Sequence, residues 1–238
     1  MPKYFFEPDA KVGNVVTLSG EVAHHLSHVL RMGVGQVITL GDGAACDYQG
    51  TITAMGKNSV ICKVGEPTPS PGELPVRITL FQSLPKGDKL ELIIQKAVEL
   101  GVHEIVPVAT ARSIVKVKGD GKKVERYQRI AQSAAEQSMR GIVPQVCPPV
   151  SFREGVKLTA EQSTTLVAYE GEKDNTLRME VVNGAERIGL WIGPEGGFAP
   201  DEIETLVSAG GKTITLGNRI LRTETAAIAT IAQIAVLI

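Results

Sequence analysis

The sequence has little of three features that mark specialised classes of protein: cysteine, aromatic residues and an excess of one charge. It has 3 cysteines in 238 residues, Cys46, Cys62 and Cys147. Their wide spacing indicates neither a disulfide framework nor a structural zinc site. Aromatic residues make up 4% of the chain and the formal net charge is -1. Taken alone, both values argue against a protein that binds nucleic acid by stacking many bases on a basic surface.

Long apolar runs are also missing. The longest, residues 226–238, is interrupted by Thr230 and Gln233 and is too short to span a bilayer. The N-terminal residues do not form the apolar core of a signal peptide. We therefore expect a cytoplasmic protein that does not contact membranes and whose cysteines stay reduced.

A proline-rich stretch divides the chain. Residues 66–75 contain four prolines, at positions 67, 69, 71 and 75, which neither a helix nor a central strand can accommodate. The length allows one large domain or two modest ones, and this stretch favours two. We predict a first domain of residues 1–72 and a second of residues 73–238.

The first domain shows short alternating apolar segments separated by glycine turns. Residues 15–18, 36–40 and 59–64 are the clearest of these segments, and together they predict a small β-barrel of about 70 residues. One helix is expected inside it. Ser19 is its predicted N-cap, and apolar residues recur after it at helical spacing.

The second domain alternates between strand and helix patterns. Strands are predicted at residues 77–81, 104–108, 165–169, 187–192 and 213–216, and helices at 89–100, 123–139, 201–208 and 224–237. Continuous apolar strands separated by helices indicate an α/β fold with a parallel sheet covered on both faces. In such a fold ligands bind beyond the carboxyl ends of the strands.

The near-neutral net charge conceals a basic middle third. Residues 73–150 carry 12 basic and 8 acidic side chains, whereas the segments on either side are net negative. Within it, residues 112–129 hold 7 basic side chains against 2 acidic ones, the basic ones being Arg112, Lys116, Lys118, Lys122, Lys123, Arg126 and Arg129. This run could bind phosphate, or it could be the solvated face of a helix.

Two loops follow predicted strands at the edge where ligands are expected. Residues 193–198 (GPEGGF) place three glycines around one carboxylate, so that backbone groups can approach a bound molecule closely. A tight strand-to-helix turn is the alternative. Residues 216–226 (LGNRILRTETA) place Arg219 and Arg222 before a helix. Thr223 could cap that helix, while the two cations suggest an anionic partner.

Other candidate residues have ordinary explanations. His24 and His28 are spaced i, i+4 on one predicted helix face, but no further ligand lies near them, so a polar surface competes with a metal site. The pairs of Glu136 with Arg140 and of Lys96 with Glu99 could simply stabilise helices. No histidine follows His103, and no Ser/His/Asp or Cys/His arrangement is readable.

Motifs of one known enzyme family occur in order along the chain. They are residues 24–26 (HHL), 29–32 (VLRM), 96–102 (KAVELGV), 136–140 (EQSMR), 193–198 (GPEGGF) and 216–226 (LGNRILRTETA). Through these motifs the sequence closely resembles the RsmE family of small-subunit ribosomal RNA uridine-N3 methyltransferases, of the SPOUT class. The resemblance spans nearly the whole chain, and only residues 150–164 align with nothing distinctive.

The resemblance implies a fold and a cofactor. It implies a SPOUT-type parallel sheet with a C-terminal trefoil knot, an exception to un-knotted connectivity, after a PUA-like β-barrel that binds RNA. It also implies a homodimer and S-adenosylmethionine bound in the knot. The residues that would then bind the cofactor are Ala168, Tyr169, Glu170, Ile192, Gly193, Glu195, Gly196, Gly197, Leu216, Gly217, Ile220 and Leu221.

The implied reaction removes a proton from uridine N3 and requires the base to be unpaired. We predict that Arg222 stabilises the developing uridine anion and that Glu195, or alternatively Glu224, accepts the proton. The substrate would be 16S ribosomal RNA, free or in the assembled small subunit, and no metal is expected. The residues predicted to bind its phosphates are Arg31, Arg112, Lys122, Lys123, Arg126 and Arg140.

Two other kinds of protein remain as alternatives. A regulatory protein with the same sheet would bind the nucleotide without turnover, and an assembly factor would use the first domain alone to bind RNA. The intact loops at residues 193–197 and 216–226 argue against both.

Overall fold

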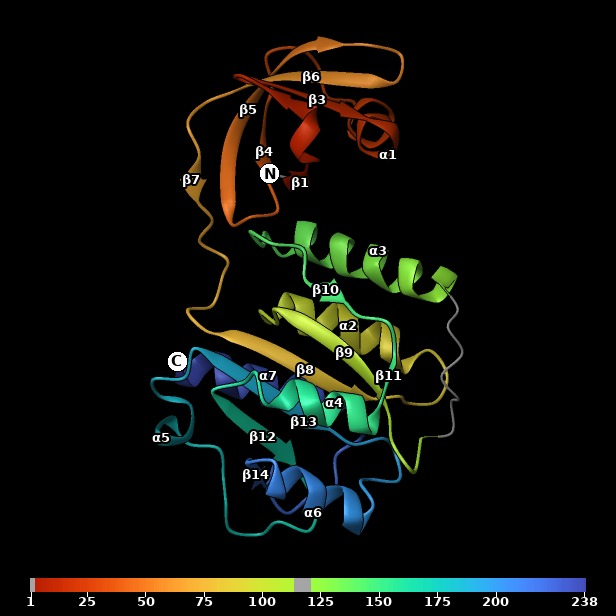
Figure 1. The fold of residues 1–238 in the computed structure, drawn as a ribbon. Helices are drawn as coiled ribbons and strands as arrows, with labels where there is room; N and C mark the ends of the chain where they lie inside the picture. The colour runs from red at the N-terminus through yellow and green to blue at the C-terminus, as the bar shows by residue number, and fades with distance from the viewer. Residues whose placement is uncertain (1–2, 114–120) are drawn as a thin grey trace. The chain divides into compact units, whose positions relative to one another are not determined.

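The computed structural model describes residues 3–113 and 121–238, apart from the side chain of Glu180 (Figure 1). The chain forms two compact units, one made of residues up to Glu73 with Ala135–Val143, and the other of Leu74–Ala134 with Pro144–Ile238. The proline-rich stretch therefore lies near one crossing between units. Residues 135–143, which the sequence assigned to the second domain, pack with the first unit instead.

The first unit is built on a mainly antiparallel sheet. In the described residues it has seven strands, in the order β1-β4-β5-β6-β3-β2 with β7 beside β5. Only β1 and β4 run parallel to each other. The strands are β1 (Lys3–Phe5), β2 (Lys11–Val12), β3 (Val15–Ser19), β4 (Val37–Gly41), β5 (Cys46–Met55), β6 (Ser59–Val64) and β7 (Thr68–Pro69).

Alternate residues of these strands form the core, as the period-2 pattern predicted. Val16, Leu18, Ile38 and Leu40 are buried. A 3-10 turn, η1 (Pro8–Ala10), precedes β2. The predicted helix consists of α1 (Gly20–His24) followed by one turn of π-helix, η2 (His25–Val29). Ser19 occupies the N-cap position, but its side chain makes no capping hydrogen bond.

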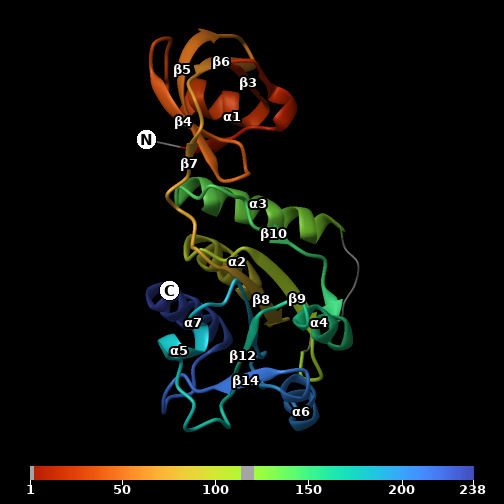
Figure 2. The same cartoon turned by 60° about the vertical axis from the view of Figure 1, so that its left-hand side comes forward.

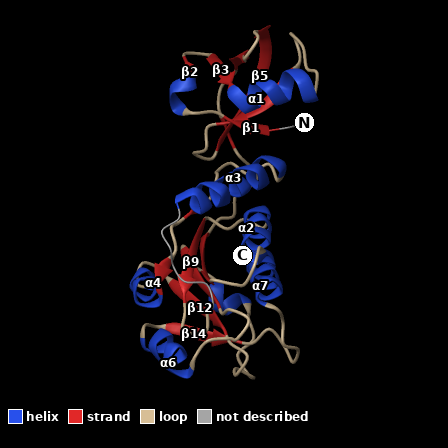
Figure 3. Ribbon diagram, turned by 90° about the vertical axis from the view of Figure 1, so that its right-hand side faces the viewer, coloured by secondary structure: helices blue, strands red, loops and turns tan. Residues whose placement is uncertain are grey.

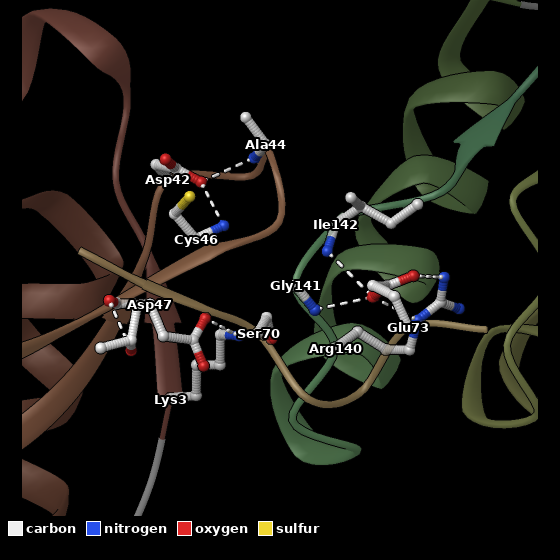
Figure 4. A network of polar contacts seen from close by, with 11 residues as sticks. Lys3, Asp42, Ala44, Cys46, Asp47, Ser70, Glu73, Arg140, Gly141 and Ile142 are labelled. Carbon is white, nitrogen blue, oxygen red and sulfur yellow. Dashed lines mark hydrogen bonds and ion pairs between the residues drawn. The ribbon is translucent and has the colours of Figure 1, made fainter. Parts of the chain in front are cut away.

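Two ion pairs join separate segments of the first unit, Lys3 to Asp47 and Arg140 to Glu73 (Figure 4). The ammonium of Lys3 is fully buried and donates to Asp47 and Ser70. The Glu73 carboxylate accepts two hydrogen bonds from Arg140, at 2.9 and 2.6 Å, and one each from the backbone N–H groups of residues 141 and 142. This carboxylate explains why residues 135–143 belong to the first unit.

The second unit contains the predicted parallel sheet. Its described strands run in the order β10-β9-β8-β13-β12-β14, with β11 beside β9, and every pairing is parallel. The strands are β8 (Arg77–Ser83), β9 (Glu104–Ala109), β10 (Gln145–Val146), β11 (Val150–Ser151), β12 (Thr164–Ala168), β13 (Arg187–Ile192) and β14 (Gly211–Ile214). The α/β prediction is confirmed.

Helices cover both faces of this sheet (Figure 3). On one face lie α4 (Phe152–Thr159) and α6 (Pro200–Ser208), over a core in which Trp191 stacks on Phe81 with ring centroids 4.8 Å apart. On the other face α2 (Lys89–Glu99) packs on α7 (Thr223–Leu237). Short helix α5 (Met179–Val182) also contacts α7 (Figure 2). Helix α3 (Gly121–Gln137) contributes its last three residues to the first unit.

Two differences from the predicted elements matter. Strand β14 ends at Ile214 rather than at residue 216; Thr215 still forms an isolated β-bridge with Thr176, and Leu216 lies in the loop that follows. Helix α4 was not predicted, although Ser151 and Glu154 form a capping box before it. Their S-x-x-E spacing is a signal that could have located this helix.

Candidate functional site

A cavity of about 430 Å³ lies in the second unit, within the size range typical of small-molecule sites. Its walls are the segments that follow the carboxyl ends of β12, β13 and β14, where ligands bind in such sheets. The structure brings all twelve residues predicted to bind the cofactor into this one lining, together with Arg222. Residues far apart in sequence thus form a single site.

The loop after β13 requires its glycines. Gly197 has a φ of +67°, in the left-handed region, and a Cβ there would collide with the Glu170 carboxylate. A Cβ on Gly193 would lie 3.3 Å from the Cα of Gly197, so the loop closes tightly on itself. Nη1 of Arg112 donates to the carbonyl of Gly196 at 2.7 Å. The backbone is therefore available to a ligand with little side chain in the way.

The loop before α7 is tied to the loop after β13 by one threonine. The Thr223 hydroxyl donates to the carbonyl of Gly193 at 2.6 Å and accepts from Nε2 of Gln82 at 3.0 Å. Thr223 was expected to be the N-cap, but α7 begins at Thr223 and Arg222 occupies the cap position. Because its hydroxyl points to another loop, the side chain joins two walls of the cavity rather than capping a helix.

The third wall is held in place by Glu172. Its carboxylate accepts hydrogen bonds from the Thr213 hydroxyl at 2.6 Å, from three backbone N–H groups at residues 173–175, and from the Asn175 side chain. These bonds, that from Thr213 foremost, lower the pKa of Glu172 to about 2. The segment that carries Glu170 and Lys173 is thus fixed to β14.

Glu195 points toward the start of α2. Its Oε1 accepts from Nζ of Lys89 at 2.8 Å and from the backbone N–H of Lys86 at 3.2 Å. Burial raises the pKa of Glu195, but these hydrogen bonds and the Lys89 charge outweigh it, so the pKa lies below its ordinary value. The hydrogen bond that Lys89 donates to Glu195 raises the pKa of Lys89. Glu195 is therefore an ionised and weakly basic carboxylate.

Glu224 lies near this pair but does not line the cavity. Its Oε2 is 3.5 Å from Nζ of Lys89 and, among the described side chains, is a buried oxygen without a hydrogen-bond partner. Arg222 and Arg219 line the cavity and are exposed, and Ile220 between them is 90% exposed. This wall therefore presents two cations and one apolar side chain to solvent.

The predicted phosphate-binding residues fall into different places. Lys122, Lys123 and Arg126 are exposed on α3, and Arg126 also pairs with Glu91 at 2.8 Å. Lys116 and Lys118, which belong to the same basic run, lie outside the described residues. Arg112 is exposed but contacts the loop after β13, at Gly196. The basic face of α3 is thus available to a ligand.

The prediction for Arg140 is wrong. Its side chain is 2% exposed and makes a bidentate contact with Glu73, so it cannot reach an RNA phosphate. The residue instead joins residues 135–143 to the first unit. Arg31, also predicted to bind RNA, is exposed and has a φ of 52°, an uncommon conformation for a residue other than glycine.

The histidines show no metal geometry. The rings of His24 and His28 stack at 4.6 Å, and Nδ1 of His25 lies 2.8 Å from the Tyr4 hydroxyl. Within the described ranges, no cluster of three or more His, Cys, Asp or Glu residues could hold a metal ion. In the same ranges, no helix is both long enough and apolar enough to cross a membrane.

Sequence reasoning missed several residues of the site. Lys89 and Glu172 hold two of its walls, and Lys173, Thr215 and Asn218 are part of its lining. A signal for Lys89 was present, because the glycine turn at residue 87 lies in the short loop that leads from β8, which ends at Ser83, to α2. Nothing in the sequence near Glu172 indicated its contact with β14.

Comparisons with known proteins identify methyltransferases that are similar along most of the chain. Family models match residues 72–235 as an RNA methyltransferase domain and residues 18–65 as an RNA methyltransferase PUA domain. The chain is 38% identical to ribosomal RNA small subunit methyltransferase E of Bacillus subtilis, over 95% of this chain and 93% of that protein.

Two solved structures with bound cofactor are also similar. One is the ribosomal RNA small subunit methyltransferase E of Neisseria gonorrhoeae bound to S-adenosyl methionine, with 34% identity, a TM-score of 0.87, and coverage of 100% of this chain and 98% of that one. The other is a putative methyltransferase of Legionella pneumophila with the same cofactor, with 29% identity, a TM-score of 0.81, and coverage of 98% and 96%.

Proposed function

The chain belongs to the ribosomal RNA small subunit methyltransferase E family, and we propose that it methylates N3 of one uridine in 16S ribosomal RNA. It is an S-adenosylmethionine-dependent ribosomal RNA methyltransferase with an N-terminal PUA-like domain. The observation that carries the proposal is the single cavity in which residues from three strand ends converge beside two arginines.

The cavity fits S-adenosylmethionine. Its volume suits a nucleoside-sized ligand, and Gly193 and Gly197, where a Cβ would meet neighbouring protein atoms, leave the backbone of this loop without side chains. When bound, the cofactor supplies a methyl group on a cationic sulfur. The carboxylates of Glu170 and Glu195 in the lining would offset that charge, while the glycine loop would orient the molecule.

We propose that this site is built on a trefoil knot of the SPOUT type. Three observations support this: β14 pairs with β12, Thr215 donates to the carbonyl of Asn175, and the next segment returns to Gly193 through Thr223. The C-terminal chain thus contacts two earlier loops in succession. If the C-terminal segment is threaded through these loops, its position explains why α7 begins at the cavity wall.

Arg222 is the proposed stabiliser of the uridine anion. It is exposed at the cavity wall, where a guanidinium could hydrogen-bond to a uracil oxygen as charge develops. Of the two candidate proton acceptors, Glu195 lines the cavity and Glu224 does not. We therefore keep Glu195 in that role. Its lowered pKa keeps it ready to accept a proton across the neutral range, although as a weak base.

The RNA would be held by the exposed cations of α3 and by Arg31 in the first unit. We also propose a homodimer. Helix α7 is apolar on nearly all sides and leaves Val236 84% exposed, whereas helices with this composition are normally buried. Sedimentation of the purified protein would test the dimer. We place the enzyme in the cytoplasm, since its substrate is ribosomal RNA.

The function is tested by incubating the protein with labelled S-adenosylmethionine and either free 16S ribosomal RNA or assembled small subunits, followed by nucleoside analysis. We expect N3-methyluridine with one of the two. Arg222→Ala should keep cofactor binding and lose single-turnover methylation. Absence of N3-methyluridine with both substrates would refute the proposed reaction, and unchanged turnover in Arg222→Ala would refute the role of that arginine.

A further inference from the structure

Three charged side chains from separate segments meet beside the cavity. Lys89 begins α2, Glu195 lies in the loop after β13, and Glu224 lies in the first turn of α7. One ammonium serves both carboxylates, at 2.8 Å from Oε1 of Glu195 and 3.5 Å from Oε2 of Glu224. The three side chains are 29%, 28% and 15% exposed, so water screens their interaction only in part.

The segment before α2 is shaped to reach Glu195. Gly87 has a φ of +62°, which turns the chain between Lys86 and the start of the helix. The backbone N–H of Lys86 and the side chain of Lys89 therefore approach the same carboxylate oxygen. The short segment before α2 and the first residue of that helix thus hold the loop that is proposed to bind the cofactor, through two hydrogen bonds to Glu195.

We propose that Lys89 is a positioning residue that holds Glu195, and with it the loop of residues 193–197, next to the cofactor pocket. It acts through Glu195 and does not itself line the cavity. The inference rests on the proposed binding of S-adenosylmethionine by residues 193–197. It assigns to the start of α2 a role in setting the charge and the shape of that loop.

Removing the ammonium should change the electrostatics in a defined direction. The charged groups that face Glu195 are Lys89 from α2 and, across that ammonium, Glu224 from α7. Arg112 contacts the neighbouring carbonyl of Gly196 rather than the carboxylate. Without Lys89, the two carboxylates repel each other and the pKa of Glu195 rises. Glu195 then takes up a proton at a higher pH and loses its attraction for a cationic ligand.

The test measures S-adenosylmethionine binding by calorimetry on the full chain, without RNA, from about pH 3 to pH 8, so that the range includes the lowered pKa of Glu195 in the unmodified protein. In Lys89→Met, Glu195 stays ionised at neutral pH, and we expect about tenfold weaker binding there because the loop of residues 193–197 is no longer held in place. We also expect the midpoint of the pH dependence to move up by about one unit or more. Lys89→Arg, which keeps the charge, should bind nearly as the unmodified protein does. Lys96→Met is the matched control, because Lys96 forms an ion pair with Glu99 on the same helix.

A second variant, Glu195→Gln, separates the proposed effect of Lys89 on Glu195 from a general effect of Lys89→Met on folding. Glu195→Gln has no carboxylate at that position to protonate, so adding Lys89→Met to it should produce no further shift of the midpoint. If Lys89→Met shows the affinity and midpoint of Lys96→Met, the inference is overturned. Because no RNA is present, a protein that binds the cofactor but forms no N3-methyluridine would refute the proposed function and leave the result for Lys89 intact.

Discussion

Glu73 is the residue whose loss should most weaken the first unit. Its carboxylate accepts four hydrogen bonds, two of them from a guanidinium whose side chain is 2% exposed. Glu73→Gln keeps the size of the side chain but removes the negative charge from its buried contact with Arg140. Breaking a buried pair from one side costs about 3–5 kcal/mol, a large share of the roughly 5–15 kcal/mol that stabilises a typical domain.

The assay must distinguish the two units. The single tryptophan, Trp191, is buried in the second unit, so its fluorescence reports on that unit alone. Native-state hydrogen exchange of peptides from β4 to β6 reports on the first unit. We expect Glu73→Gln to lose exchange protection there while the urea midpoint of Trp191 fluorescence changes little. Glu99→Gln, which breaks the partly exposed Lys96 pair, should cost about 1 kcal/mol or less.

The pH dependence follows from the same carboxylate. Burial raises the pKa of Glu73, but the Arg140 contacts and the backbone donors outweigh this effect, so that the pKa lies below its ordinary value of 4.5. A lowered pKa adds stability above the unfolded-state value, and this stability is lost as the pH falls through the folded-state value. The loss of stability of the first unit caused by Glu73→Gln should therefore be largest at pH 7 and become smaller below about pH 4.5. Unchanged protection in Glu73→Gln at pH 7 would refute this account.

Three further predictions concern the site and the RNA. Gly197→Ala should weaken cofactor binding measured by calorimetry by about tenfold or more, since its strained backbone and the clash at Cβ act together. Thr223→Val removes a hydroxyl that links two walls, and we expect about tenfold slower turnover with retained Trp fluorescence; unchanged turnover would make the link dispensable. Replacing Lys122, Lys123 and Arg126 should flatten the slope of log RNA affinity against log salt concentration by about two units. An unchanged slope would show that this face of α3 is solvated and does not bind RNA.

The parallel sheet could be predicted because it depends on local pattern, whereas the twelve cofactor-binding residues were predicted from the resemblance to a known family. Apolar strands such as residues 187–192 are recognisable one at a time, and the parallel fold then places the segments that follow them at one edge. The three glycines within residues 193–197 could also be interpreted from the sequence alone, as a loop whose backbone lies close to neighbouring groups. Their left-handed or crowded backbone excludes other residues.

Long-range partners were beyond sequence reasoning. Arg140 was read as a surface cation because charge alone does not reveal that Glu73, 67 residues earlier, buries it. Thr223 met every local criterion for a cap, yet its hydroxyl binds Gly193, 30 residues away. Lys89 likewise acquires its role from Glu195. In each case, the deciding interaction joins segments that only the folded chain brings together.

The Glu73 contact has a consequence for modularity. Because residues 135–143 pack with the first unit, the chain crosses between units three times, after residues 73, 134 and 143. The first unit is therefore encoded in two separate pieces, and a fragment ending at residue 72 would lack both Glu73 and Arg140, the partners of one of its ion pairs. Exchange of this module between enzymes would require both pieces to move together, whereas a simple fusion at the proline-rich stretch would leave the second piece behind.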